Sequence, residues 1–381
     1  MPAHPLLWVE IDRAALGHNI GLFRKLIGPG KKLLAVVKAN AYGHGLLEVS
    51  RLALARGVDW LGVHSLEEAL ALRAAGLRPP VLILGAVALD DLRTAVEADA
   101  RLTIYNPETV DRLAAVTARL GKKARVHVKV ETGTNRQGVA EKQLLGLVRR
   151  IRKSPNLVLE GLSSHFANIE DTTDPSYPDY QLENYKRAAS LLEDQGLRVP
   201  VKHMSCTAAT ILFPRTHFDL ARVGIGLYGL WPSKETYLSC LHQHLSPLKL
   251  KPVLSWKTRV VQVKTLAKGS FVGYGCTFRT TRPSRLAVLP VGYSDGYDRR
   301  LSNAGYVLIR GRRAPVRGRV AMDFIMVDVT DVPAAKLEDE VTLLGRDGRE
   351  SISAEQMASL AGTISYEVLA RINPLLPRRV V

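Results

Sequence analysis

Eight short apolar runs rich in β-forming residues constrain the fold more than any other feature of the sequence. They are LLAVVK (33–38), WLGVHS (60–65), VLILG (81–85), LTIYN (102–106), VHVKV (126–130), LEGLSSH (159–165), VKHMS (201–205) and ARVGIGLYG (221–229). Between them lie stretches such as LEEALALRAAG, whose apolar residues recur every three or four positions up to a glycine, a pattern typical of helices. Eight buried strands alternating with helices predict an α/β fold, a (β/α)8 barrel. The spacing alone leaves a doubly wound open sheet as the alternative.

The pattern changes after residue 232, where a polar stretch with His242, His244, Ser246 and Pro247 is typical of a connection. Beyond it, segments such as SWKTRVVQV, RLAVLPVGY and FIMVDVT show two-residue alternation or short β-branched runs. We therefore predict a barrel domain over residues 1–240 and a β-rich domain over residues 241–381, interrupted by one helix at AEQMASLAG. The apolar segment within residues 1–12 falls outside the eight units and is a candidate to pair with the C-terminal sheet.

The net charge of +17, from 53 Lys and Arg against 36 Asp and Glu, raises the question of an anionic partner. The basic residues form short scattered pairs without interleaved aromatic residues, so we expect no nucleic-acid partner. The three cysteines have no metal-type spacing, which predicts no metal site and a reducing, cytoplasmic setting. The longest apolar stretch, Val81 to Leu89, is too short for a membrane span, and we expect neither export nor membrane association.

Lys38 closes the first apolar run, at the strand end where barrels build their active sites. Burial there disfavours the ammonium form and makes the amine a competent nucleophile. The alternative is a lysine that extends from a strand end into solvent. Asn40, Tyr42 and His44 follow in a polar, glycine-containing loop, and this neighbourhood favours a functional lysine.

The segment AVVKANAYGHG around Lys38 resembles the pyridoxal-phosphate (PLP) attachment motif of the alanine racemase family. The resemblance continues through VKVETGTNRQG, SHFANIED, ARVGIGLYGL, VGYGCTF, PVGYSDGY, GRVAMD and SYEV, and so covers almost the whole chain. Members of that family have a (β/α)8 barrel followed by a β domain, as the patterning predicts independently. The resemblance implies an isomerase that interconverts L- and D-alanine for peptidoglycan, with PLP attached to Lys38.

The resemblance also implies roles for residues that would otherwise be read as surface charges, ion pairs or packed core residues. Lys38 and Tyr274 would be the two acid-base groups, with Tyr274 reaching the site from the partner subunit of a homodimer. Arg222 would face the pyridine nitrogen of PLP, which a guanidinium does not readily protonate. The cofactor-binding residues would be Lys38, Tyr42, His165, Thr207, Arg222, Gly224, Ile225 and Tyr366.

Arg136 and the backbone N–H of Met322 would bind the substrate carboxylate. Lys129 resembles a family lysine that is often carbamylated, a change that replaces a cation near Arg136 by an anion. Two positions depart from the family pattern: Cys206 precedes Thr207 where Asn-Ser is usual, and Ala321 stands where cysteine is common. Both leave the shape of the pocket and the substrate range open.

Three alternatives remain on the same fold. The first is a racemase for serine, lysine or several amino acids. The second is a barrel PLP decarboxylase, whose cysteine-centred C-terminal motif we do not find in the sequence. The third is a non-catalytic PLP-binding protein, which would lack Tyr274 and the β domain.

Overall fold

The computed structural model describes residues 5–171, 173–242 and 248–381, and it divides the chain into two compact units. Residues 16–41 and 49–251 form the barrel unit, and residues 1–15, 42–48 and 252–381 form the β unit. The predicted connection around His244, Ser246 and Pro247 lies outside the described residues. The predicted boundary between residues 240 and 241 stays a prediction.

The barrel unit is built on eight parallel strands. They are β2 (Lys32–Val36), β3 (Trp60–Val63), β4 (Val81–Ile83), β5 (Ala100–Ile104), β6 (Ala124–Lys129), β7 (Leu157–Ser163), β8 (Val201–His203) and β9 (Leu220–Val223). They pair in the order β8-β7-β6-β5-β4-β3-β2-β9. The ends of this path meet, because Asp219 N donates to Lys202 O at 3.0 Å and Arg222 N donates to Ser205 O at 3.2 Å. The predicted (β/α)8 barrel is confirmed, and the open sheet is excluded.

Each predicted apolar run overlaps one of these strands, but the strand ends before the run does. In most cases the last two residues of the run, including Lys38 and His165, lie in the loop after the strand. In ARVGIGLYG the second half forms a 3₁₀ helix, η3 (Ile225–Tyr228), whose Tyr228 hydroxyl donates to Val36 O at 2.8 Å. The polar residues at the run ends are therefore available for a site.

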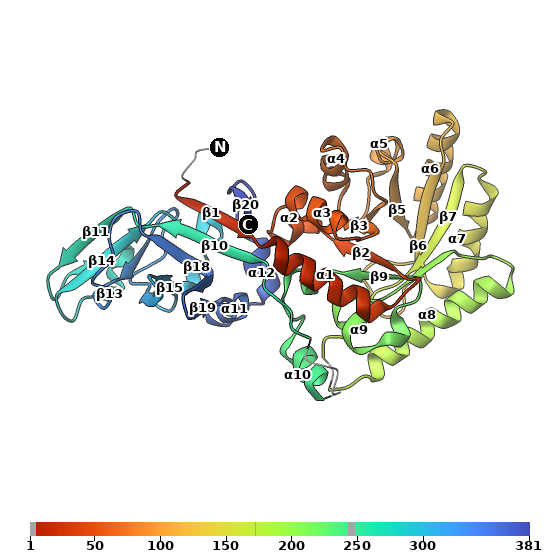
Figure 1. The fold of residues 1–381 in the computed structure, drawn as a ribbon. Helices are drawn as coiled ribbons and strands as arrows, with labels where there is room; N and C mark the ends of the chain where they lie inside the picture. Colours follow the sequence, from red (N-terminus) through yellow and green to blue (C-terminus); the bar gives the residue numbers. More distant parts are fainter. Residues whose placement is uncertain (1–4, 172, 243–247) are drawn as a thin grey trace. The chain divides into compact units, whose positions relative to one another are not determined.

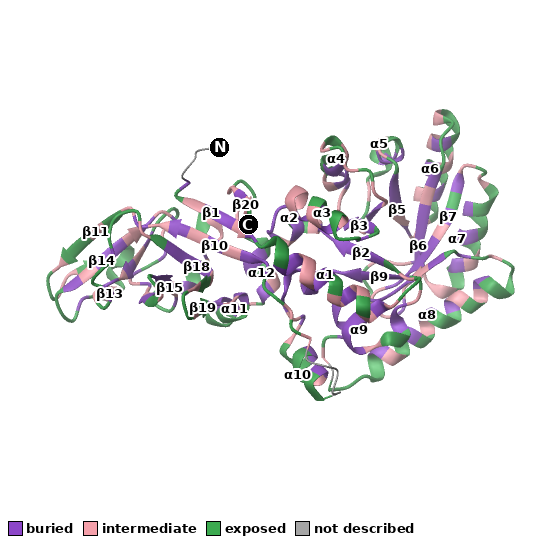
Figure 2. Ribbon diagram, in the orientation of Figure 1, coloured by how far each residue is buried: buried purple, intermediate pink, exposed green. Residues whose placement is uncertain are grey.

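The helices up to residue 242 alternate with these strands (Figure 1). They are α1 (Arg13–Ile27), α3 (Leu46–Ala55), α4 (Leu66–Ala74), α5 (Leu92–Glu97), α6 (Pro107–Leu120), α7 (Glu141–Lys153), α8 (Ser176–Asp194), α9 (Thr207–Leu212) and α10 (Lys234–His242). Helix α6 shows why they form: the Asn106 side chain caps its first turn, Pro107 stands at its start, and Gly121 ends it with φ 61°. Its buried face carries Val110 and Leu113. Figure 2 shows the barrel strands as buried.

The described residues of the β unit form three sheets, which bring together distant segments of the chain. The largest has the order β16-β15-β18-β10-β1-β20, with β19 paired to β18. Its strands are β1 (Leu7–Ile11), β10 (Leu254–Arg259), β15 (Tyr306–Ile309), β16 (Arg312–Pro315), β18 (Glu340–Asp347), β19 (Glu350–Ile352) and β20 (Arg378–Val380). The smaller sheets comprise β11 (Gln262–Leu266), β14 (Ser284–Leu289) and β17 (Ile325–Asp328), and β12 (Phe271–Val272) with β13 (Phe278–Arg279). Strand β1 pairs antiparallel with β10 and parallel with β20.

Two helices follow β19, of which the sequence predicted only the first. Helix α11 (Ala354–Ala361) begins with a capping box, in which Ser353 Oγ accepts from Gln356 N at 3.1 Å and Gln356 Oε1 accepts from Ser353 N at 2.9 Å. Helix α12 (Ser365–Ala370) is too short to show a helical period in the sequence. Helix α10 was likewise missed, in the stretch read as a connection. No helix among the described residues has the length and apolar character needed to cross a membrane.

The turn α2 (Lys38–Tyr42) after β2 is left-handed. Ala39, Asn40, Ala41 and Tyr42 all have φ between 52° and 53°, a region that costs about 1–2 kcal/mol for each residue with a Cβ atom. The division between the two units falls inside this turn, after Ala41. A strained backbone of this kind is kept only where surrounding contacts hold it.

Candidate active site

Five basic side chains predicted from the sequence interact at the carboxyl ends of the barrel strands. They are Lys38, Lys129, Arg136, His165 and Arg222. The pKa of His165 lies well below its ordinary value because of burial and, after that, the positive charges of the other four. A site with this excess of positive charge fits an anionic ligand.

Lys38 is the first residue of the left-handed turn, and its side chain is half-buried. Glu68 of α4 holds the backbone beside it, accepting from Ala39 N at 2.6 Å and from His64 N at 2.7 Å. No hydrogen bond or close ion pair joins the Lys38 ammonium to another described residue. Burial and then the charge of Arg136 lower the pKa of Lys38, although Glu68 opposes them. The amine is therefore suited to nucleophilic chemistry.

Arg222 is buried on β9 and donates hydrogen bonds to groups at the carboxyl ends of β7 and β8. Its Nη1 donates to Nδ1 and to the carbonyl of His203, at 2.7 and 3.0 Å. Its Nη2 donates to the carbonyls of Ser164 and Met204, at 2.8 and 3.0 Å, and contacts Nδ1 of His165 at 3.3 Å. No described carboxylate forms an ion pair with it. Burial lowers the pKa of Arg222 to about 10, so the guanidinium is charged at neutral pH.

The contact with Arg222 fixes the protons of the histidines behind it. A guanidinium only donates, so Nδ1 of His203 accepts and its proton is assigned to Nε2. That Nε2 lies 2.8 Å from Nδ1 of His127, whose Nε2 lies 3.0 Å from Oε2 of Glu160. Burial lowers the pKa of both histidines and keeps the imidazoles neutral. Gly161 makes room for them, because a Cβ atom there would lie 2.0 Å from Nδ1 of His127.

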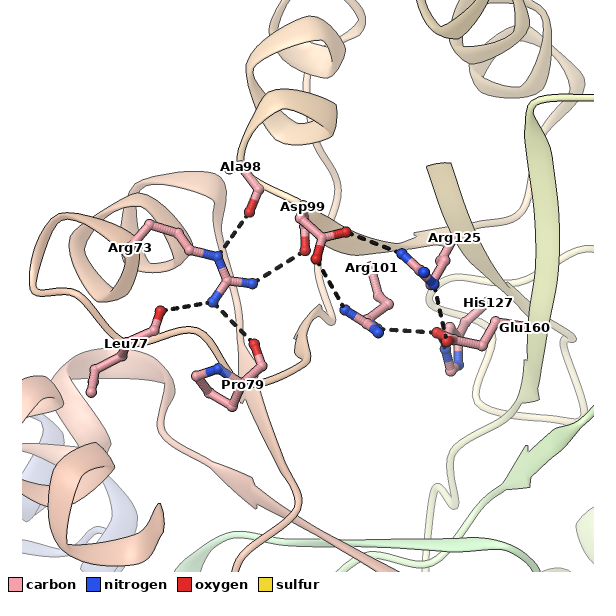
Figure 3. A network of polar contacts seen from close by, with 9 residues as sticks. All are labelled: Arg73, Leu77, Pro79, Ala98, Asp99, Arg101, Arg125, His127 and Glu160. Atoms are coloured by element: carbon pink, nitrogen blue, oxygen red, sulfur yellow. Dashed lines mark hydrogen bonds and ion pairs between the residues drawn. The ribbon is translucent and has the colours of Figure 1, made fainter. Parts of the chain in front are cut away.

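Figure 3 shows the outer end of this network. Glu160 contacts Arg101 at 3.2 Å and Arg125 at 3.7 Å, while Asp99 contacts Arg125 at 3.2 Å and Arg101 at 3.8 Å. Burial favours a higher pKa for Glu160, but the hydrogen bond from His127 and the nearby charges lower it overall. Glu160 is therefore a carboxylate, linked to the buried guanidinium through two neutral imidazoles.

Lys129 is buried as the last residue of β6. Burial is the largest influence on its pKa, followed by the charges of Arg222 and Arg136, and together they lower it to about 8. A substantial fraction of the amine is consequently neutral near physiological pH. Arg136 itself is exposed in the loop after β6.

Gln181 of α8 ties the loop that carries Arg136 to the segment that carries His165. Its Nε2 donates to His165 O at 3.2 Å and to Thr134 Oγ1 at 3.4 Å, and its Oε1 accepts from Ala167 N at 2.8 Å. The Thr134 hydroxyl donates to the same His165 carbonyl at 2.6 Å. The glutamine is fully buried, so these bonds hold both loops in place.

Thr207, Gly224 and Ile225 lie together after β8 and β9. Thr207 begins α9, and its hydroxyl accepts from Gly224 N at 3.1 Å and from Gly226 N at 3.5 Å. Ile225 is buried at the start of η3. Cys206 precedes Thr207, and burial raises the pKa of its thiol, so this departure from the family pattern places an uncharged group beside the threonine.

The four remaining predicted residues lie in the β unit. Tyr42 and Tyr366 are brought together there, with ring centroids 6.1 Å apart. Tyr274 and Met322 are exposed by 75% and 54%. The fragment of the β unit that carries Tyr274 is a 3₁₀ turn, η4 (Tyr274–Cys276).

Sequence reasoning missed the residues that hold the basic cluster in place. These are Glu68, His127, Glu160, Gln181 and His203. A signal existed for some of them: Glu160 and His127 are polar residues in the interior of the strands LVLEGLS and ARVHVK, with apolar residues among their neighbours. Such residues need buried partners, although the sequence does not say which. Among the described residues, no group of three or more metal-ligating side chains occurs.

Two family models together match most of the chain. "Alanine racemase, N-terminal domain" matches residues 11–232, and "Alanine racemase, C-terminal domain" matches residues 253–380. The chain is 40% identical over 379 residues to an alanine racemase of Methanococcus maripaludis, covering 99% of both proteins. It is 43% identical over 366 residues to one of Syntrophobacter fumaroxidans, covering 96% of this chain and 95% of the relative.

The solved structures that share this fold include alanine racemases and a histidine racemase. An alanine racemase of Bacillus anthracis with bound L-Ala-P superposes with a TM-score of 0.92 at 36% identity, covering 100% of this chain and 96% of that one. A histidine racemase of Leuconostoc mesenteroides superposes with a TM-score of 0.90 at 30% identity, covering 100% and 99%. The likeness therefore extends over the full length in both cases.

Proposed function

The chain belongs to the alanine racemase family, and from that membership we propose that it interconverts L- and D-alanine with PLP held at the carboxyl end of its barrel. It is an isomerase of the PLP-dependent kind. The observation that carries the proposal is the Lys38 amine, which has a lowered pKa and stands among cationic groups. D-Alanine for peptidoglycan, made in the cytoplasm, is the physiological product we propose.

The residues of the barrel unit fit PLP. Lys38 offers an amine that makes no hydrogen bond to another described residue, as covalent attachment to an aldehyde requires. The surrounding cations suit an anionic cofactor. Arg222 offers a charged donor without a carboxylate partner among the described residues. When bound, PLP supplies an electron sink that acidifies the α-C–H bond of an attached amino acid.

Two groups move the α-proton in this proposal. Nζ of Lys38 takes it from D-alanine, and Oη of Tyr274 of the partner subunit takes it from L-alanine, each group returning a proton on its own face. The exposure of Tyr274, at 75% of its surface, supports a role in which it serves a neighbouring molecule. The proposed assembly is accordingly a homodimer with two shared sites.

Arg222 keeps its proton in this reaction. Its pKa of about 10 and its fixed contacts with His203 hold the guanidinium as a donor that gives no proton to the cofactor ring. Held in this form, Arg222 would leave the ring nitrogen of PLP unprotonated, which would weaken the electron sink and limit side reactions. His165 assists by its contact with Arg222.

In this proposal the remaining residues bind the substrate carboxylate and the cofactor phosphate and orient them. Arg136 and the backbone N–H of Met322 would hold the substrate carboxylate. Tyr42, Tyr366, Thr207, Gly224 and Ile225 would surround the cofactor phosphate. We propose that Lys129 is carbamylated, since its pKa of about 8 leaves a neutral amine for reaction with carbon dioxide; the new N–C bond releases one proton and leaves an anion that orients Arg136.

A chiral assay tests the proposal. The protein is reconstituted with PLP and given L- and D-alanine, L-serine, L-lysine and L-histidine, and the enantiomers of each product are separated. We expect alanine to be racemised fastest. Faster conversion of another amino acid would favour the corresponding racemase, and PLP binding without turnover would favour a non-catalytic PLP-binding protein.

The variant Lys38→Ala tests the role of the lysine, with Lys32→Ala as its matched control. We expect it to lose the visible absorbance band of bound PLP and all racemisation, whereas Lys32→Ala, at an exposed position of the preceding strand β2, should keep both. A colourless wild-type protein that cannot be reconstituted with PLP would contradict the proposed function.

A further inference from the structure

Arg378 on β20 is a buried arginine whose donors are taken up entirely by backbone carbonyls. Its Nη2 and Nε donate to Gly43 O at 2.9 and 3.3 Å. Its Nη1 donates to the carbonyls of Asn373, Pro374 and Leu376, at 2.8, 2.9 and 2.7 Å. One guanidinium thus joins the last strand and the turn before it to the loop that begins at Tyr42.

Burying the charged side chain of Arg378 in this way is energetically unfavourable. Burial lowers the pKa of Arg378, and the charge of Glu48 only partly opposes that. No described carboxylate forms a close ion pair with it. A buried charge without a close counterion is destabilising unless its hydrogen bonds are needed.

The loop on the receiving side is tightly packed at one residue. Gly43 has φ 81°, and a Cβ atom there would lie 2.0 Å from the carbonyl oxygen of Leu369 in α12. Tyr42 stands just before it, with its ring 6.1 Å from that of Tyr366 in the same helix. His44 follows, and its Nδ1 lies 2.9 Å from Tyr42 O. Arg378 and α12 therefore hold the backbone of this loop from two directions within the β unit.

We propose that Arg378 is a positioning residue that fixes Tyr42 for the cofactor phosphate. The inference rests on the proposed function, in which the Tyr42 hydroxyl reaches that phosphate. Tyr42 is the last residue of a left-handed turn that is strained at four positions, so its place depends on contacts outside the turn. The bonds from Arg378 to Gly43 O supply such a contact one peptide away.

Arg378→Lys tests the proposal, with Arg379→Lys as its control. The lysine keeps the charge but lacks the planar fork that reaches Gly43 and the Asn373 turn together. Arg379 is the next residue of β20 and stacks over Trp8 at 5.8 Å. The apo forms of wild type and both variants are titrated with PLP and with pyridoxal, which lacks the phosphate, and their melting temperatures are recorded.

In Arg378→Lys we expect the Kd for PLP to rise about tenfold, the scale of one lost charge-assisted hydrogen bond. The Kd for pyridoxal should change less than about threefold, and Arg379→Lys should bind both like wild type. If Arg378→Lys does not fold, Arg378→Gln is judged by the same ratio.

Two results would overturn the proposal while leaving the proposed function intact. One is an unchanged Kd for PLP in the Arg378 variant. The other is an equal loss of affinity for PLP and pyridoxal, which would mean a purely structural role. Failure of the wild-type protein to bind PLP would instead reject the proposed function, and this inference with it.

Discussion

Nη1 of Arg222 lies 2.7 Å from Nδ1 of His203, and this contact determines the direction of every hydrogen bond from there to Glu160. Because the guanidinium only donates, each imidazole donates a hydrogen bond away from Arg222: His203 donates to His127, and His127 donates to the carboxylate of Glu160. The buried guanidinium of Arg222 is therefore linked to the negative charge of Glu160 through two neutral rings. We therefore expect substitutions at the carboxylate, and at the point where the two rings meet, to lower the stability of the protein.

Glu160→Gln removes the carboxylate charge while keeping an acceptor for His127. We expect the free energy of unfolding at pH 7 to fall by about 1–3 kcal/mol, because the hydrogen bond from Arg101 loses its charged acceptor and the ion pair with Arg125 is lost. Glu183→Gln, which breaks an exposed pair with Lys186, should change it by less than about 0.5 kcal/mol. Denaturant unfolding of the three proteins measures both values.

The same comparison has a defined pH dependence. The pKa of Glu160 is lowered from 4.5 in the folded protein, so its stabilising effect is complete above about pH 4.5 and is lost as the pH falls through the lowered pKa. The difference between wild type and Glu160→Gln should therefore shrink below about pH 4.5. A difference that persists unchanged to about pH 3 would contradict this assignment.

Gly161→Ala should disturb the junction of the two rings. Its Cβ atom would lie 2.0 Å from Nδ1 of His127, so either the ring or the strand must move, at about 1–3 kcal/mol. Gly146→Ala in α7 has open space around the new methyl group and should stabilise by roughly 0.5–1 kcal/mol. Equal stability changes in the two variants would show that the ring contact has no effect.

Tyr274→Phe removes one of the two proposed acid-base groups. We expect PLP binding to be retained and racemisation of L-alanine to fall by about 100-fold or more. Tyr237→Phe, at another exposed tyrosine, is the control. Near-normal rates in both directions would reject the two-base assignment.

Mixing inactive subunits tests whether the site is shared. If Tyr274 serves the partner subunit, a hybrid of Lys38→Ala and Tyr274→Phe chains contains one intact site, and random pairing restores about one quarter of the wild-type activity. Both parents are nearly inactive alone. No recovery after subunit exchange would mean that both groups act within one chain.

Lys129 should take up carbon dioxide in a pH-dependent way. Its pKa of about 8 means that the neutral, reactive fraction rises about tenfold per pH unit until that value is reached. In ¹³C-bicarbonate we expect a carbamate resonance in the ¹³C NMR spectrum that grows between pH 6 and about pH 8. The resonance should be absent from Lys129→Arg and present in Lys142→Arg, and its persistence in Lys129→Arg would assign it elsewhere.

The barrel could be predicted because its strands are continuous in apolar residues and its helices stop at glycine. The positions of Lys38 and Arg222 near the carboxyl ends of strands follow from the same pattern. The left-handed turn could not be predicted, since alanine at positions 39 and 41 has no preference for positive φ. Its conformation depends on packing that the local sequence does not encode.

The polar network was beyond prediction for a related reason. Glu160, His127 and His203 lie on three neighbouring strands, and their contacts depend on the register between strands. The glycine at 161 that allows the rings to meet looks like any glycine in a strand. Helix α12 was missed because six residues containing Tyr366 and Val368 carry no clear period.

The pairing of β1 between β10 and β20 has a consequence for the order of biosynthesis. Strand β1 is made before the whole barrel segment, but its parallel neighbour β20 is made only after that segment. The barrel segment can collapse while β1 waits with open backbone edges, which are prone to pair with other chains. Truncating the final strand should therefore expose β1 in every newly made molecule and lead to aggregation before any loss of the barrel itself.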